Sequence, residues 1–184
     1  MKKLAQRLNY RGFRSHFRRI ALLLLPMFGF LSSDASPLEI GASAPTITVT
    51  SSEGDSIDLA ELYAKGPTLV YFYPKADTPG CTTQACNLRD SYETLTDSGI
   101  QVVGVSTDEV EAQAAFKEKY SLPFLLVADS KGELVDAFGV PKKMNSFASR
   151  QSFLIVGGDV VWRDLKATPK TQSEDALAAL KDAQ

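Results

Sequence analysis

Residues 68–86 read TLVYFYPKADTPGCTTQAC and contain the only two cysteines of the 184-residue chain, Cys81 and Cys86. The run from Thr68 to Tyr73 is continuously apolar, which is typical of a central strand buried on both faces of a sheet. From residue 82 onward the apolar spacing becomes that of a helix. Pro79-Gly80 therefore places Cys81 where a strand passes into a helix, and the free N–H groups of a helix N-terminus favour a reactive thiolate.

Strands and helices alternate on either side of this passage. Strands are predicted at 47–50, 56–58, 101–106, 124–127, 152–156 and 160–162, and helices from 82 to about 98, from 107 or 108, at 133–138 and from a cap at Ser173. The second of these helices is expected to group Ala112, Ala115, Phe116 and Tyr120 on one face, and residues 141–150 are expected to form a polar loop. The order predicts an α/β protein: a thioredoxin-like fold, with a central mixed sheet flanked by helices and an N-terminal β-hairpin extension.

Charge divides the chain into two parts. Residues 1–35 hold seven of the 20 basic residues and one of the 22 acids, so residues 36–184 carry a net charge of −8. A basic leader on an acidic body indicates a targeting segment, not a nucleic-acid-binding surface. We therefore expect a signal or targeting segment at 1–35 and one domain at 36–184.

The leader resembles an export signal. Its apolar run at 20–31 contains Pro26 and is shorter than the roughly 20 residues that a membrane span needs. Ser33 and Ala35 occupy the −3 and −1 positions of a cleavage site before Ser36. We expect export to the periplasm or to an organelle (thylakoid) lumen after cleavage near Ala35. An uncleaved membrane anchor, a disordered basic tail and an organelle transit segment are the alternatives.

The loop before Cys81 carries a specific motif. Residues 74–81 have the form P-x-x-x-T-x-x-C, and residues 71–90 resemble a peroxiredoxin of the bacterioferritin-comigratory, or Q-type, subfamily. The resemblance extends from about Gly41 to the last helix. It implies a thiol-dependent peroxidase that reduces hydrogen peroxide and organic hydroperoxides. In this scheme Cys81 is oxidised to sulfenic acid, Cys86 forms a disulfide with it, and thioredoxin or a similar dithiol reduces the disulfide.

The resemblance also implies roles for three further residues. Thr78 would hydrogen-bond the sulfur and the peroxide, Pro74 would shield the site from water, and Arg150 would stabilise the thiolate and the departing oxygen. Arg89 and Asp90 match the subfamily too, but neighbouring opposite charges on a helix are usually solvated. The chain departs from the subfamily at Gln84 (often Glu), Leu88 (often Phe), Ser152 (often Thr) and the turn at 156–158.

Helix geometry places a condition on the implied disulfide. Residues five apart in an intact helix have Cα atoms roughly 8–9 Å apart. A disulfide needs Cα atoms within about 7 Å of each other. Cys81 and Cys86 can therefore bond only after the first turn of the helix unwinds, which predicts a folded reduced state and a locally unfolded oxidised state.

Other functions fit the sequence less well. A structural disulfide across five residues would constrain the unfolded chain little, and two cysteines without a histidine after His16 are too few for a typical zinc site. A protein disulfide oxidoreductase, or a non-enzymatic redox sensor that exposes apolar surface on unwinding, are the alternative functions. No metal, haem or flavin is expected as cofactor. The expected partners are a peroxide and a thioredoxin-like reductant, without nucleic acid or stable membrane insertion, and the mature chain is expected to be a monomer.

Overall fold

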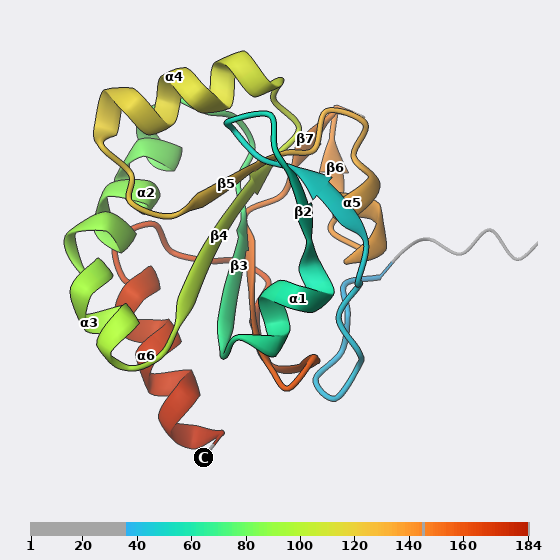
Figure 1. Cartoon of the computed structure of the whole chain (residues 1–184), viewed down its shortest axis with the longest axis vertical. Helices are drawn as coiled ribbons and strands as arrows, with labels where there is room; N and C mark the ends of the chain where they lie inside the picture. Colours follow the sequence, from blue (N-terminus) through green and yellow to red (C-terminus); the bar gives the residue numbers. More distant parts are fainter. Residues whose placement is uncertain (1–35, 145, 184) are drawn as a thin grey trace, which may run out of the picture. The chain divides into compact units, whose positions relative to one another are not determined.

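A five-stranded mixed sheet forms the centre of the protein in the computed structural model, which describes residues 36–144 and 146–183 (Figure 1). The strands are β3 (Thr68–Phe72), β4 (Gln101–Ser106), β5 (Leu125–Ala128), β8 (Gln151–Val156) and β9 (Asp159–Asp164), in the spatial order β5-β4-β3-β8-β9. β3 pairs parallel with β4 and antiparallel with β8. The mixed sheet agrees with the sequence prediction, whereas the expectations for residues 1–35 lie outside the described part.

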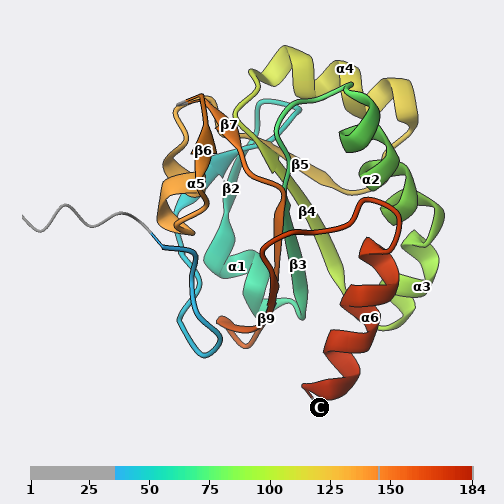
Figure 2. The same ribbon diagram turned by 180° about the vertical axis from the view of Figure 1, so that it is seen from behind.

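Helices cover both faces of the sheet (Figures 1 and 2). One face is covered by α2 (Pro79–Asp90), α3 (Tyr92–Asp97), α4 (Val110–Tyr120) and α6 (Gln172–Asp182). The other is covered by α1 (Leu59–Ala64), α5 (Glu133–Ala137) and the predicted hairpin, β1 (Thr48–Thr50) with β2 (Ser56–Asp58). Successive β3 residues point to opposite faces, so Leu69 and Tyr71 join the first layer and Val70 and Phe72 the second. All five β3 residues are buried, which confirms the central strand.

The predicted long helix from residue 82 is two helices. It begins at Pro79 and breaks at Ser91, whose φ of −103° and ψ of 9° lie outside the helical region, before α3 starts. Serine favours such breaks because its hydroxyl competes with the helical backbone. The apolar spacing did not reveal the break, because Leu88 before it and Leu95 after it are both fully buried.

Helix α4 begins later than expected and buries a different face. Asp108, which accepts hydrogen bonds from Ala76 N–H and the Ser106 hydroxyl, precedes the helix, and α4 starts at Val110. The predicted face was partly wrong, because Ala112 and Ala115 are exposed. Gln113 is buried instead, since its amide donates to the Ser106 hydroxyl and to Val127 O.

Two smaller differences lie near the C-terminal end. The predicted loop at 141–150 contains a short antiparallel pair, β6 (Lys142–Lys143) and β7 (Phe147–Ala148). α6 starts at Gln172 after Thr171, so Ser173 is not its cap. Ser173 N–H donates instead to the side chain of Asn87 on α2. Among the described helices none is both long and apolar enough to cross a membrane.

Candidate active site

Cys81 lies in the first turn of α2. Pro79 is the first residue of the helix, where its missing N–H costs nothing, and Thr78 precedes it in an extended conformation. Thr78 O accepts the first helical hydrogen bond, from Thr82 N–H at 2.8 Å. The Cys81 side chain is 2% exposed and belongs to the apolar cluster between this helix layer and the sheet. The predicted position of the thiol at a helix N-terminus is therefore the observed one.

The strand register brings Arg150 to this sulfur. β3 and β8 are antiparallel with Phe72 opposite Gln151, so the chain leaving β3 and the residue preceding β8 meet at one edge of the sheet. Arg150 Nη2 lies 3.3 Å from Cys81 Sγ. A guanidinium at this distance stabilises negative charge on the sulfur.

Neutral side chains hold the guanidinium in place. Arg150 Nη1 donates to Gln84 Oε1, and Gln84 Nε2 donates to Gln172 Oε1 on α6. The Ser152 hydroxyl donates to the same Gln172 oxygen at 2.8 Å. None of the ion pairs in the described residues involves Arg150, so its positive charge faces the sulfur without a carboxylate partner.

Sequence reasoning did not identify Gln172. It stands far along the chain from both cysteines, in a helix with no motif of its own, and only the tertiary structure brings it to Gln84. Gln84 and Ser152 were noted as departures from the subfamily. The structure shows that these two departures belong to one network, because both bond Gln172.

The loop at 74–78 leads from β3 into α2, just before Cys81. The Thr78 hydroxyl donates to Lys75 O at 3.0 Å, so the described hydrogen bonds do not join it to Cys81. Pro74 is half-buried at the end of β3. The Asp77 carboxylate, at a left-handed φ of 56°, binds Lys119 Nζ at 2.7 Å and the Tyr120 hydroxyl at 2.6 Å, which ties the loop to α4.

Tyr71 of β3 and Tyr73, just after the end of that strand, belong to the same apolar cluster as Cys81. Tyr71 and Tyr73 are fully buried, and their rings stack with centroids 5.5 Å apart. Burial raises the pKa of both hydroxyls well above the ordinary value, with the sulfur of Cys81 contributing in the same direction. Both tyrosines therefore stay neutral and keep the surroundings of the sulfur in a low dielectric.

Cys86 lies on the same helix, half-buried, and both thiols are free. It borders a surface hollow of about 450 Å³ with Thr82, Thr83, Asn87, Asp90 and Lys170. Because α2 is continuous from Pro79 to Asp90, the structure holds the two cysteines in the helical spacing that prevents a disulfide. Within residues 36–144 and 146–183 no cluster of three potential metal ligands occurs.

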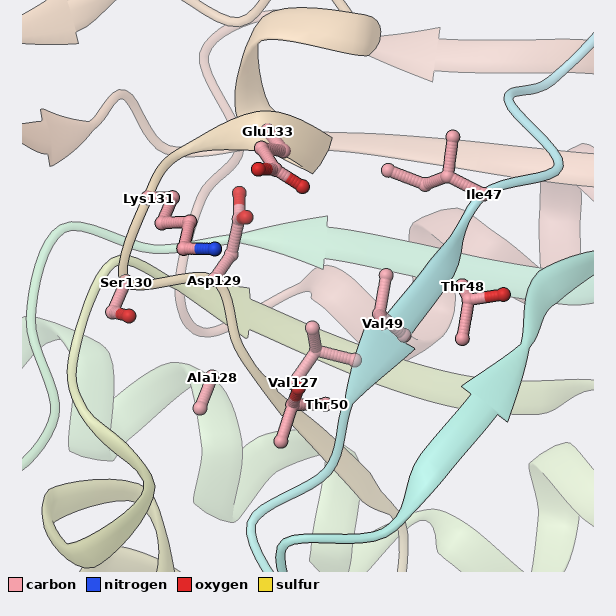
Figure 3. A pocket seen from close by; sticks show the side chains of 10 residues that line it. All are labelled: Ile47, Thr48, Val49, Thr50, Val127, Ala128, Asp129, Ser130, Lys131 and Glu133. Atoms are coloured by element: carbon pink, nitrogen blue, oxygen red, sulfur yellow. The ribbon is translucent and has the colours of Figure 1, made fainter.

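A second cavity lies away from the cysteines, between β1 and the turn after β5 (Figure 3). It holds about 120 Å³ and contains the carboxylate of Asp129. That carboxylate accepts a hydrogen bond from Val135 N–H at 2.8 Å, in the first turn of α5. Burial raises the pKa of Asp129. Its hydrogen bond to the backbone of α5 gives this buried carboxylate a structural role.

A sulfur buried in a low dielectric, with one guanidinium beside it, is suited to attack a small neutral electrophile such as a peroxide. On a thioredoxin-like sheet, this arrangement defines the class of thiol-dependent peroxidases. Residues 40–163 match the model of the AhpC/TSA family, and the chain belongs to that family. The resemblance stated from the sequence is thereby confirmed.

Curated relatives narrow the comparison to one branch. The chain is 40% identical over 154 residues to peroxiredoxin Bcp of Bacillus subtilis, covering 79% of this chain and 96% of that protein. It is 34% identical over 148 residues to chloroplastic peroxiredoxin Q of Suaeda salsa, covering 80% and 68%. Both relatives bear names of the Bcp or Q type.

Solved structures agree with this placement. Peroxidoxin BcpB of Mycobacterium tuberculosis superposes with a TM-score of 0.74 at 28% identity, covering 80% of this chain and 99% of that one. Peroxiredoxin Q of Xanthomonas campestris superposes with a TM-score of 0.71 at 32% identity, covering 82% and 98%. The chain is a thiol-dependent peroxidase, and peroxiredoxins act on peroxides and are reduced by thioredoxin-like partners.

Proposed function

We propose that this chain reduces hydrogen peroxide and organic hydroperoxides through a cycle that uses Cys81 and Cys86. The Cys81 thiolate attacks one peroxide oxygen, the O–O bond breaks, and the sulfur becomes sulfenic acid, while the departing oxygen takes up a proton from solvent and leaves as water or an alcohol. The observation that carries the proposal is the 3.3 Å contact between Arg150 Nη2 and Cys81 Sγ at the start of α2.

Arg150 and Thr78 are proposed to act on the peroxide as well as on the sulfur. The guanidinium stabilises the thiolate first and then the charge that develops on the departing oxygen. The Thr78 hydroxyl donates its hydrogen bond to Lys75 O, so its oxygen is left as an acceptor for a peroxide O–H. Pro74, half-buried just after the end of β3, is proposed to limit water around the sulfur.

Cys86 is proposed to resolve the sulfenic acid. Its thiol attacks the Cys81 sulfur, a disulfide forms, and the oxygen leaves as water. An external dithiol such as thioredoxin then reduces the disulfide and becomes oxidised itself. The reaction needs these thiols alone and no prosthetic group.

Organic hydroperoxides are included because of a relative. Structures of trapped intermediates and ligand complexes of the Xanthomonas campestris bacterioferritin comigratory protein concern its alkyl peroxide reduction activity. That protein is 30% identical to this chain and superposes with a TM-score of 0.72.

The residue roles are tested by identifying the oxidised species. The reduced protein is mixed with one equivalent of hydrogen peroxide and quenched with a thiol-blocking reagent. Its mass is then measured by intact-protein mass spectrometry. Wild type should lose two hydrogens as a disulfide, and Cys86→Ser should stop at a sulfenic acid trapped by dimedone on Cys81. Trapping of the sulfenic acid on Cys86 in the Cys81→Ser variant at the wild-type rate would overturn the assignment.

The mature protein is proposed to begin near Ser36 and to work as an exported or lumenal monomer. The basic, apolar leader supports export, and the plant Q-type relatives are chloroplastic. The net charge of −8 on residues 36–184 opposes nucleic-acid binding. Monomeric function is consistent with one chain carrying both cysteines. Sedimentation of residues 36–184 as a stable dimer would contradict the last point.

A further inference from the structure

Two polar side chains on one face of α2 form hydrogen bonds with residues 170–173, where α6 begins. Asn87 donates its amide to Lys170 O and accepts from Ser173 N–H, both at 3.0 Å. Gln84, three residues earlier, donates to Gln172 Oε1. The segment 170–173 thus makes three hydrogen bonds to α2. The α2 residues in these bonds, Gln84 and Asn87, are neighbours of Cys86 in the sequence, and Lys170 borders the same surface hollow as Cys86.

The remaining contacts of α2 differ on the two sides of Gln84 and Asn87. After Asn87, Leu88 is fully buried and Arg89 Nη1 donates to Tyr120 O at 2.8 Å. Before Gln84, Pro79 and Gly80 are exposed, whereas Cys81 packs in the apolar cluster and its sulfur contacts Arg150. The bonds of Gln84 and Asn87 therefore lie between the first turn, which holds Cys81, and the end of the helix, which Leu88 and Arg89 anchor.

We propose that Asn87 and Gln84, bonded to residues 170–173, form a clasp that determines how readily the first half of α2 unwinds to let Cys86 reach Cys81. The inference rests on the proposed function and adds a regulation of that site. Gln84 also bonds Arg150, so opening the clasp there releases the guanidinium from its support at the same time.

The clasp sets the outcome of a competition. After the first peroxide, the Cys81 sulfenic acid either loses its oxygen as water while forming a bond to Cys86, or reacts with a second peroxide. The second reaction adds one oxygen to the sulfur, giving sulfinic acid, and releases water or an alcohol. A tighter clasp slows the first route and leaves more time for the second.

The Asn87→Ala variant tests this directly. Alanine has the higher helix propensity, so its local effect is to keep α2 wound. Loss of two hydrogen bonds to segment 170–173 acts in the opposite direction and should dominate. We expect the disulfide to form about five to ten times faster than in wild type. Its formation is measured by intact-protein mass spectrometry of samples quenched at intervals after a peroxide pulse. The sulfinic fraction at a fixed peroxide excess should fall, while the rate of the first oxidation stays at the wild-type value.

Two further variants separate the clasp from general effects. Thr83→Ala removes a hydroxyl that bonds Pro79 O inside the same helix and raises helix propensity without touching α6, so it should not accelerate disulfide formation. Asn87→Asp keeps the acceptor for Ser173 N–H and loses the donor to Lys170 O, so its rate should lie between wild type and Asn87→Ala.

The possible failures are distinguishable. If all variants complete the first oxidation but N87A forms the disulfide no faster than wild type, the clasp is refuted and the peroxidase assignment stands. Equal acceleration in Thr83→Ala also refutes the clasp. If Cys81 in wild type is not oxidised by peroxide at all, the proposed function itself is overturned.

Discussion

We propose that the chemistry of Cys81 depends on Arg150 more than on any other side chain. Its two terminal nitrogens contact the sulfur and Gln84, so charge and orientation come from one group. Replacing Arg150 with Met keeps much of the apolar stem and removes the donors. By analogy with loss of an oxyanion donor, we expect peroxide oxidation of Cys81 to slow by about 10²–10³-fold. Stopped-flow oxidation of the reduced variant checks this, and a loss below threefold would contradict the role.

Gly80 leaves room for that guanidinium. A Cβ built on Gly80 would lie 3.2 Å from Arg150 Nη2, closer than ordinary contact, and its backbone is compatible with alanine. In Gly80→Ala we expect opposite effects on two measured quantities. The thermal midpoint should rise or stay unchanged, because alanine favours the helix by up to about 1 kcal/mol, whereas the rate of Cys81 oxidation should fall. A variant that oxidises as fast as wild type would show that the arginine position is not critical.

The residues of the site were predictable to different degrees. Cys81 and Arg150 were expected together because the motif resembles a known subfamily, and the structure places them in contact. The hydrogen-bond partner of the Thr78 hydroxyl was not predicted, because this hydroxyl donates to Lys75 O within its own loop. Gln172 could not be foreseen, because no local pattern relates a glutamine on the last helix to the strand and helix it joins.

At the scale of elements, the loop at 74–78 depends on its link to α4. Hydrogen bonds from Lys119 and Tyr120 hold the pKa of the Asp77 carboxyl below its ordinary value. A lowered folded-state pKa means that the carboxylate stabilises the fold above the unfolded pKa, and that this contribution is lost as pH falls through the folded value.

We therefore expect Asp77→Asn to have a lower melting temperature than wild type at pH 7. Asparagine tolerates the left-handed backbone at this position, so the variant isolates the charge. The gap should close only as pH falls below about 3.9, the ordinary carboxyl value, and salt should narrow it at pH 7. Thermal unfolding across pH 2–7 at low ionic strength measures it, and a gap that is independent of pH would contradict the account.

The elements themselves show what periodicity reports. Runs of mostly apolar residues predicted β3, β4 and β8 closely, because strands buried on both faces are mostly apolar even though each also buries a polar side chain. Helix boundaries were less predictable, because tertiary hydrogen bonds decide them. Asp108 accepts a hydrogen bond from Ala76 N–H, and α4 starts only after it. Ser173, expected as a helix cap, instead donates its N–H to the side chain of Asn87.

At the scale of the whole molecule, the chain before β1 is part of the fold. Leu38 packs against the core cluster, its N–H donates to Phe138 O at 3.1 Å, and Arg163 Nη1 donates to Leu38 O at 2.9 Å. A protein starting at Ser36 keeps these contacts. In urea unfolding, one starting at Ala42 should lose about 2–3 kcal/mol relative to it. Equal stability of the two truncations would show that residues 36–41 are dispensable.

The central claim is that Cys81 attacks the peroxide and that Cys86 follows after α2 unwinds. The most direct test mixes reduced 36–184 protein with increasing hydrogen peroxide and follows both steps by stopped flow in wild type, Cys81→Ser and Cys86→Ser. We predict a fast phase whose rate is proportional to the peroxide concentration and which only Cys81→Ser lacks. A slower phase, whose rate is independent of peroxide, should be absent from both Cys81→Ser and Cys86→Ser. A wild-type protein that reacts no faster than free cysteine would contradict the claim.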